Sequence, residues 1–354
     1  MKLYSNITIL FCIWILSVLI VFYSGFFLFP NNGSVSVNFI ERLGNWDGGH
    51  YINIAKLGYI DNSQYAFFPL YPLLIKLVSQ ITGSYLIAGL FISITSSFFA
   101  MHLLFKLVSQ DFGKSIGTKT VVAFLIFPTS FFLLTTYSEG LFLLLVVLTF
   151  YFLRQKKLVL ATIICALASA TRLAGLAIFL ALLFEVQISS GINRKNWYVL
   201  FGALGFILYC FYLYTKTSDP FYFITAEASW QRFITVPGFS FWETIKALVN
   251  NGFLNKDYFN AFLELTFSIF GLGMSLRVFR FLPASFGIYA LISIFLPIFS
   301  SSLTSIPRFI LPIFPIFILL SFSKNQNVLF FYQLISIMLL SVFSILYING
   351  YWVS

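Results

Sequence analysis

Residues 9–29 read ILFCIWILSVLIVFYSGFFLF, a run without a charged side chain that is long enough to cross a bilayer as one helix. The 354-residue chain is 60% apolar and 20% aromatic but only 9% charged. Soluble domains carry about 25% charged residues, so this chain lacks the side chains needed to cover a water-exposed surface. The sequence therefore predicts an all-α integral membrane protein. Because the first run exceeds the roughly 7–15 apolar residues of a secretory signal, we expect it to be retained as the first span.

Further apolar runs divide the chain into about eleven predicted transmembrane helices. They lie at 7–29, 84–106, 119–136, 138–153, 158–171, 173–187, 197–215, 259–277, 281–300, 308–322 and 328–349. The stretch 158–187 can also be interpreted as one long bent pair. We expect a single membrane domain over residues 1–354, without an internal repeat or a soluble domain.

Basic residues fall in alternate connections between these spans. With the N-terminus inside, the inner connections contain Lys106, Lys114, Lys119, Arg154, Lys156, Lys157, Arg194, Lys195, Arg277, Arg280 and Lys324. Cytoplasmic loops are enriched in Lys and Arg, so this alternation favours a cytoplasmic N-terminus in a cell membrane, or in the endoplasmic reticulum membrane of a eukaryote. It also accounts for the net charge of +10 without a nucleic-acid partner, for which no module is present.

Two long connections, 31–83 and 217–258, are then extracytoplasmic. Both mix aromatic with charged residues, which is typical of helices that lie along the membrane interface. The short apolar stretch 66–74 within the first connection predicts one such interfacial or re-entrant helix. Membrane lipids are therefore expected partners of both segments.

Four charged residues from separate segments are predicted to meet at the outer face. Asp47 lies in the first outer loop, Glu139 begins the fourth span, Arg172 lies between the fifth and sixth, and Arg308 opens the tenth. A charge at the centre of a span costs about 2.5–3.5 kcal/mol on insertion scales, so such residues are commonly functional. A carboxylate can accept the proton of an attacking sugar hydroxyl, and arginine is suited to a phosphate leaving group. We take Asp47 and Glu139 as catalytic candidates and the two arginines as substrate-binding candidates.

Aromatic residues around these charges are further substrate-binding candidates, namely Trp46, His50, Tyr51 and Tyr137. Trp46 and the tyrosines can equally be interfacial anchors, and His50 can be a hydrogen-bonded loop residue.

The four charged residues also have structural alternatives. Asp47 can cap a helix expected over residues 51–56, Glu139 can pair with Arg172 in a buried ion pair, and Arg308 can extend toward the lipid headgroups. Only their predicted convergence on one face favours a site.

Metal and thiol chemistry receive no support from the sequence. Cys12, Cys165 and Cys210 lie far apart in apolar runs, which predicts reduced structural thiols. No dense carboxylate cluster that would demand a metal is visible either, so no metal site is predicted.

Several short motifs in order resemble the GPI mannosyltransferase II (PIG-V) family and its prokaryotic relatives in the GT-C superfamily of membrane glycosyltransferases. The motifs are WDGGHY at 46–51, GY at 58–59, AFFPLYP at 66–72, FPTSFF at 127–132, YSE at 137–139, ATRLAG at 170–175, and Arg308 followed by FP at 314–315. The similarity covers the first half of the chain well and the second half thinly.

This resemblance implies a GT-C-like fold and transfer of a sugar, expected to be mannose, from a polyprenyl-phosphate carrier. The acceptor is expected to be an extracytoplasmic glycolipid, glycan or protein, and a protein partner remains unknown. The resemblance implies that Asp47 is the base, that Arg172 or Arg308 binds the donor phosphate, and that the anomeric configuration is inverted. It implies neither a nucleotide sugar nor a cofactor, since the lipid phosphate is both carrier and leaving group.

Two other functional classes remain open. A transporter or flippase for a lipid-linked or anionic substrate also needs membrane-embedded charges, although such proteins place them near the bilayer midplane and often have repeated halves. A non-catalytic assembly subunit could retain the same fold. Charges at span ends and two long loops on one side favour the enzyme.

Overall fold

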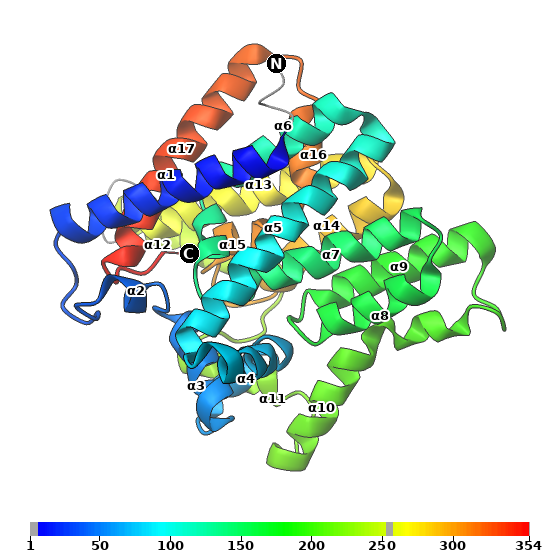
Figure 1. Ribbon diagram of the computed structural model, residues 1–354, viewed down its shortest axis with the longest axis horizontal. Coiled ribbons are helices and arrows are strands. Elements are labelled where there is room, and N and C mark those ends of the chain that lie inside the picture. Colours follow the sequence, from blue (N-terminus) through cyan, green and yellow to red (C-terminus); the bar gives the residue numbers. More distant parts are fainter. Residues whose placement is uncertain (1–5, 253–257, 354) are drawn as a thin grey trace.

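The computed structural model describes residues 6–252 and 258–353, and these are almost entirely helical (Figure 1). The elements up to the middle of the chain are α1 (Ile7–Leu28), α2 (Phe39–Arg42), α3 (Asp47–Leu57), η2 (Asn62–Ala66), α4 (Leu70–Thr82), α5 (Tyr85–Phe112), α6 (Lys114–Leu125), η3 (Ser130–Leu134), α7 (Glu139–Arg154), α8 (Leu158–Ser169) and α9 (Gly175–Ser190). The remaining elements are η4 (Trp197–Ala203), α10 (Leu204–Thr217), α11 (Tyr222–Ala226), η5 (Glu227–Trp230), α12 (Phe239–Asn251), α13 (Phe259–Phe281), α14 (Ala284–Ile298), α15 (Ile306–Ile310), α16 (Pro315–Ser321) and α17 (Gln326–Ile348). Elements labelled η are 3-10 helices.

The predicted all-helical membrane architecture is confirmed, whereas the number of spans is not settled. Five helical segments within the described residues are long and apolar enough to cross a bilayer: Ile7–Leu28, Tyr85–Phe112, Trp197–Thr217, Phe259–Phe281 and Gln326–Ile348. Shorter apolar helices pack against them: α8 and α9 contact η4, and α14 contacts α13. The number of about eleven transmembrane helices therefore stays a prediction.

Two predicted spans are not continuous helices. The segment expected at 119–136 leaves the helix after Leu125, because Pro128 has no N–H to donate and disfavours helical geometry in the residue before it. The segment expected at 308–322 is divided into α15 and α16, with Pro315 in the first turn of the latter. The stretch 158–187 likewise forms two separate helices, α8 and α9.

The chain between α6 and α7, in which the 3-10 helix η3 is the regular element, is buried inside the protein, where its backbone groups find partners. Thr136 N donates to Leu43 O at 3.0 Å, and Ser93 Oγ donates to Tyr137 O at 2.8 Å. Such irregular backbone is tolerated at membrane depth only when protein surrounds it. This segment leads directly into Glu139, so the same bonds fix the start of α7.

Small residues allow α7 to lie close to α5. A Cβ added to Gly140 would come within 2.7 Å of Ser93 O, closer than side-chain carbons approach a backbone oxygen. The α7 N-terminus is therefore set by direct contact with α5.

Charged residues gather at the two ends of helix α7. Arg154 at the end of α7, which was predicted to be cytoplasmic, pairs with Asp111 of α5 at 3.1 Å and with Glu185 of α9 at 3.4 Å. The turns from α5 to α6 and from α16 to α17 lie at the top of Figure 1, whereas α3 and α4 of the first long connection lie at the bottom. Glu139, one of the predicted outer charges, begins α7 and is therefore separated from the Arg154 cluster by the length of this helix.

Candidate active site

Asp47 and Arg308 form an ion pair between segments that are far apart in the sequence. Helix α3 begins at Asp47, four residues before the expected helix, and no side chain caps it. Asp47 Oδ2 instead accepts a hydrogen bond from Arg308 Nη1 at 2.7 Å. The Arg308 side chain is only 9% exposed, so it points into the protein rather than toward the headgroups.

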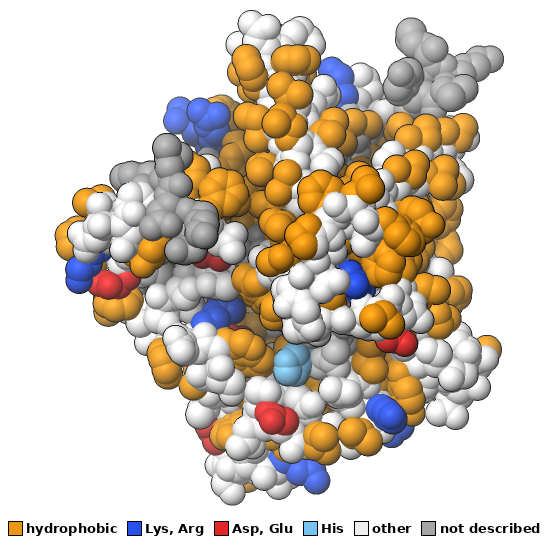
Figure 2. Space-filling view, turned by 90° about the vertical axis from the view of Figure 1, so that its left-hand side faces the viewer, with side chains coloured by type: hydrophobic (Ala, Val, Ile, Leu, Met, Phe, Trp, Pro, Cys, Tyr) orange, Lys and Arg blue, Asp and Glu red, His pale blue; other side chains and the backbone are white. Residues whose placement is uncertain are grey.

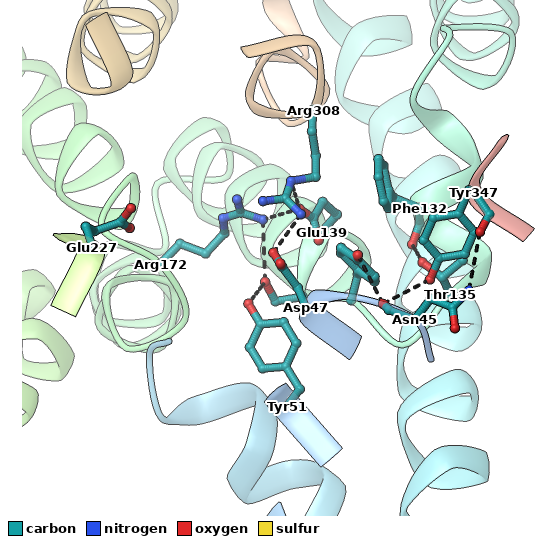
Figure 3. A network of polar contacts seen from close by, with 12 residues as sticks. Asn45, Asp47, Tyr51, Phe132, Thr135, Glu139, Arg172, Glu227, Arg308 and Tyr347 are labelled. Atoms are coloured by element: carbon teal, nitrogen blue, oxygen red, sulfur yellow. Dashed lines mark hydrogen bonds and ion pairs between the residues drawn. The ribbon is translucent and has the colours of Figure 1, made fainter. Parts of the chain in front are cut away.

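Glu139 lies between both arginines. Its Oε1 atom is 2.5 Å from Arg172 Nη1 and 3.4 Å from Arg308 Nε, and the side chain is 2% exposed. Its Oε2 atom has no hydrogen-bond partner within residues 6–252 and 258–353. The pairing considered in the sequence analysis is thus present, extended to a second arginine. Figure 3 shows Asp47, Glu139, Arg172 and Arg308 pointing toward one another from separate ribbons.

Backbone contacts hold the Arg308 end of this network in place. The short helix α15 is fixed by Thr129 Oγ1, which donates to Pro307 O at 3.1 Å. The guanidinium group of Arg308 lies 5.5 Å from the Phe132 ring centre and 5.4 Å from that of Tyr137. Aromatic faces stabilise a buried cation, so these rings offset part of the cost of burying Arg308.

Tyr51 connects the network to α3. Its hydroxyl lies 2.9 Å from Ser138 Oγ, which is also 3.5 Å from Arg172 Nη1. Burial raises the pKa of the Tyr51 phenol well above its usual value, so the group stays protonated and uncharged. Tyr51 can therefore donate a hydrogen bond to a ligand or to Ser138.

A cavity of about 960 Å³ opens beside the network. Small-molecule sites commonly enclose roughly 300–1,000 Å³, so the space suffices for a sugar with part of a lipid carrier. Its charged part contains Asp47, Arg172 and Arg308, and its wall is rich in phenylalanine: Phe67, Phe68, Phe206, Phe221, Phe223, Phe233, Phe299 and Phe309. In Figure 2, the face formed by the left-hand side of Figure 1 is largely apolar and is hollowed near its middle, where basic and acidic side chains lie in the recess.

The predicted site residues divide into two groups around this cavity. Trp46, Asp47, Tyr51, Arg172 and Arg308 line it. The other three, His50, Tyr137 and Glu139, are not among its lining residues.

His50 and Tyr137 make contacts with the surrounding protein. The His50 ring stacks on Phe67 with centres 4.9 Å apart, and Tyr137 OH donates to Asn45 O at 3.2 Å. Trp46, in contrast, reaches the cavity and packs edge-on against Trp352 at 5.1 Å. Nothing in these contacts favours His50 as a substrate ligand.

Sequence comparison matches the segment that holds most of these residues. Residues 29–191 match the sequence model of the mannosyltransferase (PIG-V) family. The resemblance to the PIG-V mannosyltransferases is confirmed. GPI alpha-1,6-mannosyltransferase 2 of Homo sapiens is 28% identical over 145 residues, which are 38% of this chain and 29% of that protein.

Structural comparison extends the similarity beyond the PIG-V segment. The crystal structure of ArnT from Cupriavidus metallidurans bound to undecaprenyl phosphate has a TM-score of 0.53 at 15% identity, covering 92% of this chain and 62% of that one. The fold is therefore GT-C-like, as expected. The chain spans less than two thirds of the length of both relatives.

The PIG-V match ends before several cavity residues that the sequence analysis did not single out. Glu227, Trp230 and Arg232 come from the second long connection, and Trp352 comes from the C-terminal segment. The sequence EASWQR at 227–232 mixes charges with a tryptophan, the pattern already noted for interfacial segments. That signal alone does not distinguish a cavity wall from a membrane anchor.

Several residues that line the cavity have a strained backbone conformation. They occur both within the segment that matches the PIG-V family and after it. Of five non-glycine residues with positive φ among those described, three line the cavity: Trp46 at 57°, Gln231 at 58° and Ser305 at 71°. Trp46 directly precedes Asp47, and Gln231 directly precedes Arg232. Such conformations cost about 1–3 kcal/mol each and cluster at functional sites.

The side chains that commonly bind metal ions do not form a cluster in the part of the chain that the structure describes. Among the residues with described positions, no group of three or more His, Cys, Asp or Glu side chains could hold a metal ion.

Proposed function

We propose that this chain is an inverting glycosyltransferase that moves mannose from a polyprenyl-phosphate carrier to an extracytoplasmic glycolipid, glycan or protein. The observation that carries the proposal is the Asp47–Arg308 pair in the wall of a large aromatic cavity. A candidate base, Asp47, and a candidate phosphate-binding cation, Arg308, thereby lie side by side. A displacement at a sugar phosphate requires both groups close to the reacting carbon. The PIG-V match supports the choice of mannose, and the undecaprenyl phosphate bound to ArnT supports a polyprenyl-phosphate donor.

The reaction is a single displacement at the anomeric carbon. An acceptor hydroxyl attacks this carbon while Asp47 accepts its proton. The bond from the anomeric carbon to the phosphate oxygen breaks, and its electron pair stays on that oxygen. Arg308 and Arg172 stabilise the additional negative charge of the departing polyprenyl phosphate. One displacement inverts the anomeric configuration.

Asp47 must exchange its partner before it can act as the base. In the resting arrangement, its Oδ2 atom accepts from Arg308 at 2.7 Å. A bound phosphate competes for the same guanidinium group, because charged phosphate oxygens are strong acceptors for arginine. Donor binding therefore releases Asp47 toward the acceptor hydroxyl.

Glu139 is proposed to position the arginines rather than to transfer a proton. It is almost fully buried, does not line the cavity and contacts both guanidinium groups. Its negative charge also lies in the first turn of α7, where the helix dipole stabilises it. This replaces the catalytic role first expected for Glu139.

The proposed orientation places the cavity on the extracytoplasmic side of the membrane, with the N-terminus in the cytoplasm. The basic turns near Arg154 and the Asp47 network occupy different parts of the bundle, which supports this assignment.

The test is transfer of label from radiolabelled polyprenyl-phosphate-mannose in membranes that contain the wild-type protein or Asp47→Asn. We expect a new labelled product with the wild type alone. Equal labelling with both proteins contradicts the role of Asp47. Labelled donor that crosses the membrane unchanged, with no product, would instead identify a flippase.

A further inference from the structure

Arg232 is a third arginine in the same cavity. It follows η5 in the second long connection, its side chain is 16% exposed, and it lines the cavity together with Arg172 and Arg308. Its Nε atom also lies 3.4 Å from Ser300 Oγ, beyond the end of α14. The proposed reaction has not so far used this residue.

The three arginines surround one aromatic ring. The guanidinium carbons of Arg172, Arg308 and Arg232 lie 5.5, 5.5 and 5.7 Å from the centre of the Phe309 ring. Like charges gathered around one ring repel each other unless anions lie between them. The arrangement therefore favours an anionic ligand at this part of the cavity.

The carboxylates that pair with the three arginines differ in how far they are exposed to solvent. Arg172 and Arg308 pair with Glu139 and Asp47, whose side chains are 2% and 18% exposed. Arg232 pairs with Glu227 at 3.3 Å, but the Glu227 side chain is 37% exposed. Figure 3 shows Glu227 apart from the Asp47 network, on the Arg172 side. Exposed ion pairs contribute little, so a phosphate with several acceptor oxygens can replace this carboxylate.

The backbone fixes Arg232 at the cavity wall. Phe233 N donates to Ser301 Oγ at 3.1 Å, Thr235 N donates to Phe299 O at 2.8 Å, and Ile234 and Ser300 form an antiparallel bridge. Gln231, directly before Arg232, has the positive φ noted above. These contacts attach the second long connection to the end of α14 and aim Arg232 at the cavity.

We propose that Arg232 is a third phosphate-binding residue for the lipid donor, and that Glu227 occupies it only until the phosphate arrives. This assignment depends on the proposed function, because it assumes a polyprenyl-phosphate ligand. It makes Glu227 a competitor of the donor. Removal of Arg232 and removal of Glu227 must therefore have opposite effects.

The experiment measures equilibrium binding of undecaprenyl phosphate to the purified full-length protein in detergent. We expect Arg232→Gln to weaken binding by roughly tenfold, since one charge-assisted hydrogen bond is lost. Glu227→Gln is expected to strengthen binding by a few-fold. Binding of undecaprenol, the uncharged alcohol, should be the same for all variants, and Arg194→Gln, at an exposed position in a predicted cytoplasmic turn, is the matched control.

The outcomes separate this inference from the proposed function. A wild type that binds undecaprenyl phosphate no better than undecaprenol overturns both. A wild type that prefers the phosphate, with Arg232→Gln unchanged, overturns only the role of Arg232. Weaker binding in both Arg232→Gln and Glu227→Gln identifies the pair as a loop contact and also overturns it. The expected opposite shifts, restricted to the phosphate, support the inference.

Discussion

Individual charged residues are the part of the site that the sequence predicts best. Charges are rare in this chain, so Asp47, Glu139, Arg172 and Arg308 stand out against apolar surroundings, and the structure brings all four together. Arg232 was missed because an arginine in a polar outer loop is unremarkable. Its position depends on pairing with residues 299–301, a contact that no local pattern indicates.

At the residue scale, Glu139→Gln should destabilise the protein. The substitution removes the buried carboxylate shared by Arg172 and Arg308 and leaves two cations without it. Breaking a buried ion pair on one side costs about 3–5 kcal/mol in the free energy of unfolding. Denaturant unfolding in mixed micelles measures the change.

The matched control for Glu139 is Asp111→Asn. Asp111 also pairs with an arginine, Arg154, but its side chain is 23% exposed. Water screens such a pair, so the expected loss is under about 1 kcal/mol. Equal losses in the two variants would show that burial of Glu139 has no special importance.

At the scale of the elements, apolar runs predicted where helices lie better than where they end. The prolines at 128 and 315 interrupt runs that hydrophobicity alone joins into single spans. Helix α3 begins at Asp47 because the strained Trp46 turns the chain there, a feature that has no sequence pattern of its own. The interruptions before α3 and α7 place Asp47 and Glu139 in the first turns of these helices.

Contact between α5 and α7 should be sensitive to one methyl group. Gly140→Ala places a Cβ 2.7 Å from Ser93 O, which neither helix can avoid without moving. We expect a loss of about 1–3 kcal/mol in the free energy of unfolding and lower transfer activity, since Glu139 is adjacent.

Gly273→Ala is the control for this effect, because among the described residues no atom outside the adjoining helix backbone lies within 4 Å of a Cβ added at that position of α13. It should be neutral, or more stable by up to about 1 kcal/mol, because alanine restricts the unfolded chain. A destabilisation as large as that of Gly140→Ala would refute the packing explanation.

For the whole molecule, the alternation of basic loops predicted a cytoplasmic side and an extracytoplasmic side, and the fold is consistent with this prediction. Arg154, Asp111 and Glu185 meet at one end although they come from three helices. The cavity wall could not be predicted, since it combines the first loop, the second loop and the C-terminal segment.

Orientation can be tested with single cysteines in a protein whose native cysteines have been replaced. An impermeant thiol reagent should label Asn62→Cys, at an exposed position in η2, from the extracytoplasmic side only. Arg194→Cys should react from the cytoplasmic side only. The reversed pattern would place the cavity in the cytoplasm and exclude the proposed extracytoplasmic acceptor.

The central claim is that Asp47 acts as the base only after donor phosphate displaces it from Arg308. The most direct measurement compares undecaprenyl phosphate binding and mannose transfer in the same preparations of wild type and Asp47→Asn. We predict that the variant binds the lipid at least as tightly, because Arg308 loses a competing carboxylate, while transfer falls by roughly 10²–10⁴-fold. Loss of binding together with transfer, or transfer at the wild-type rate, would contradict the account.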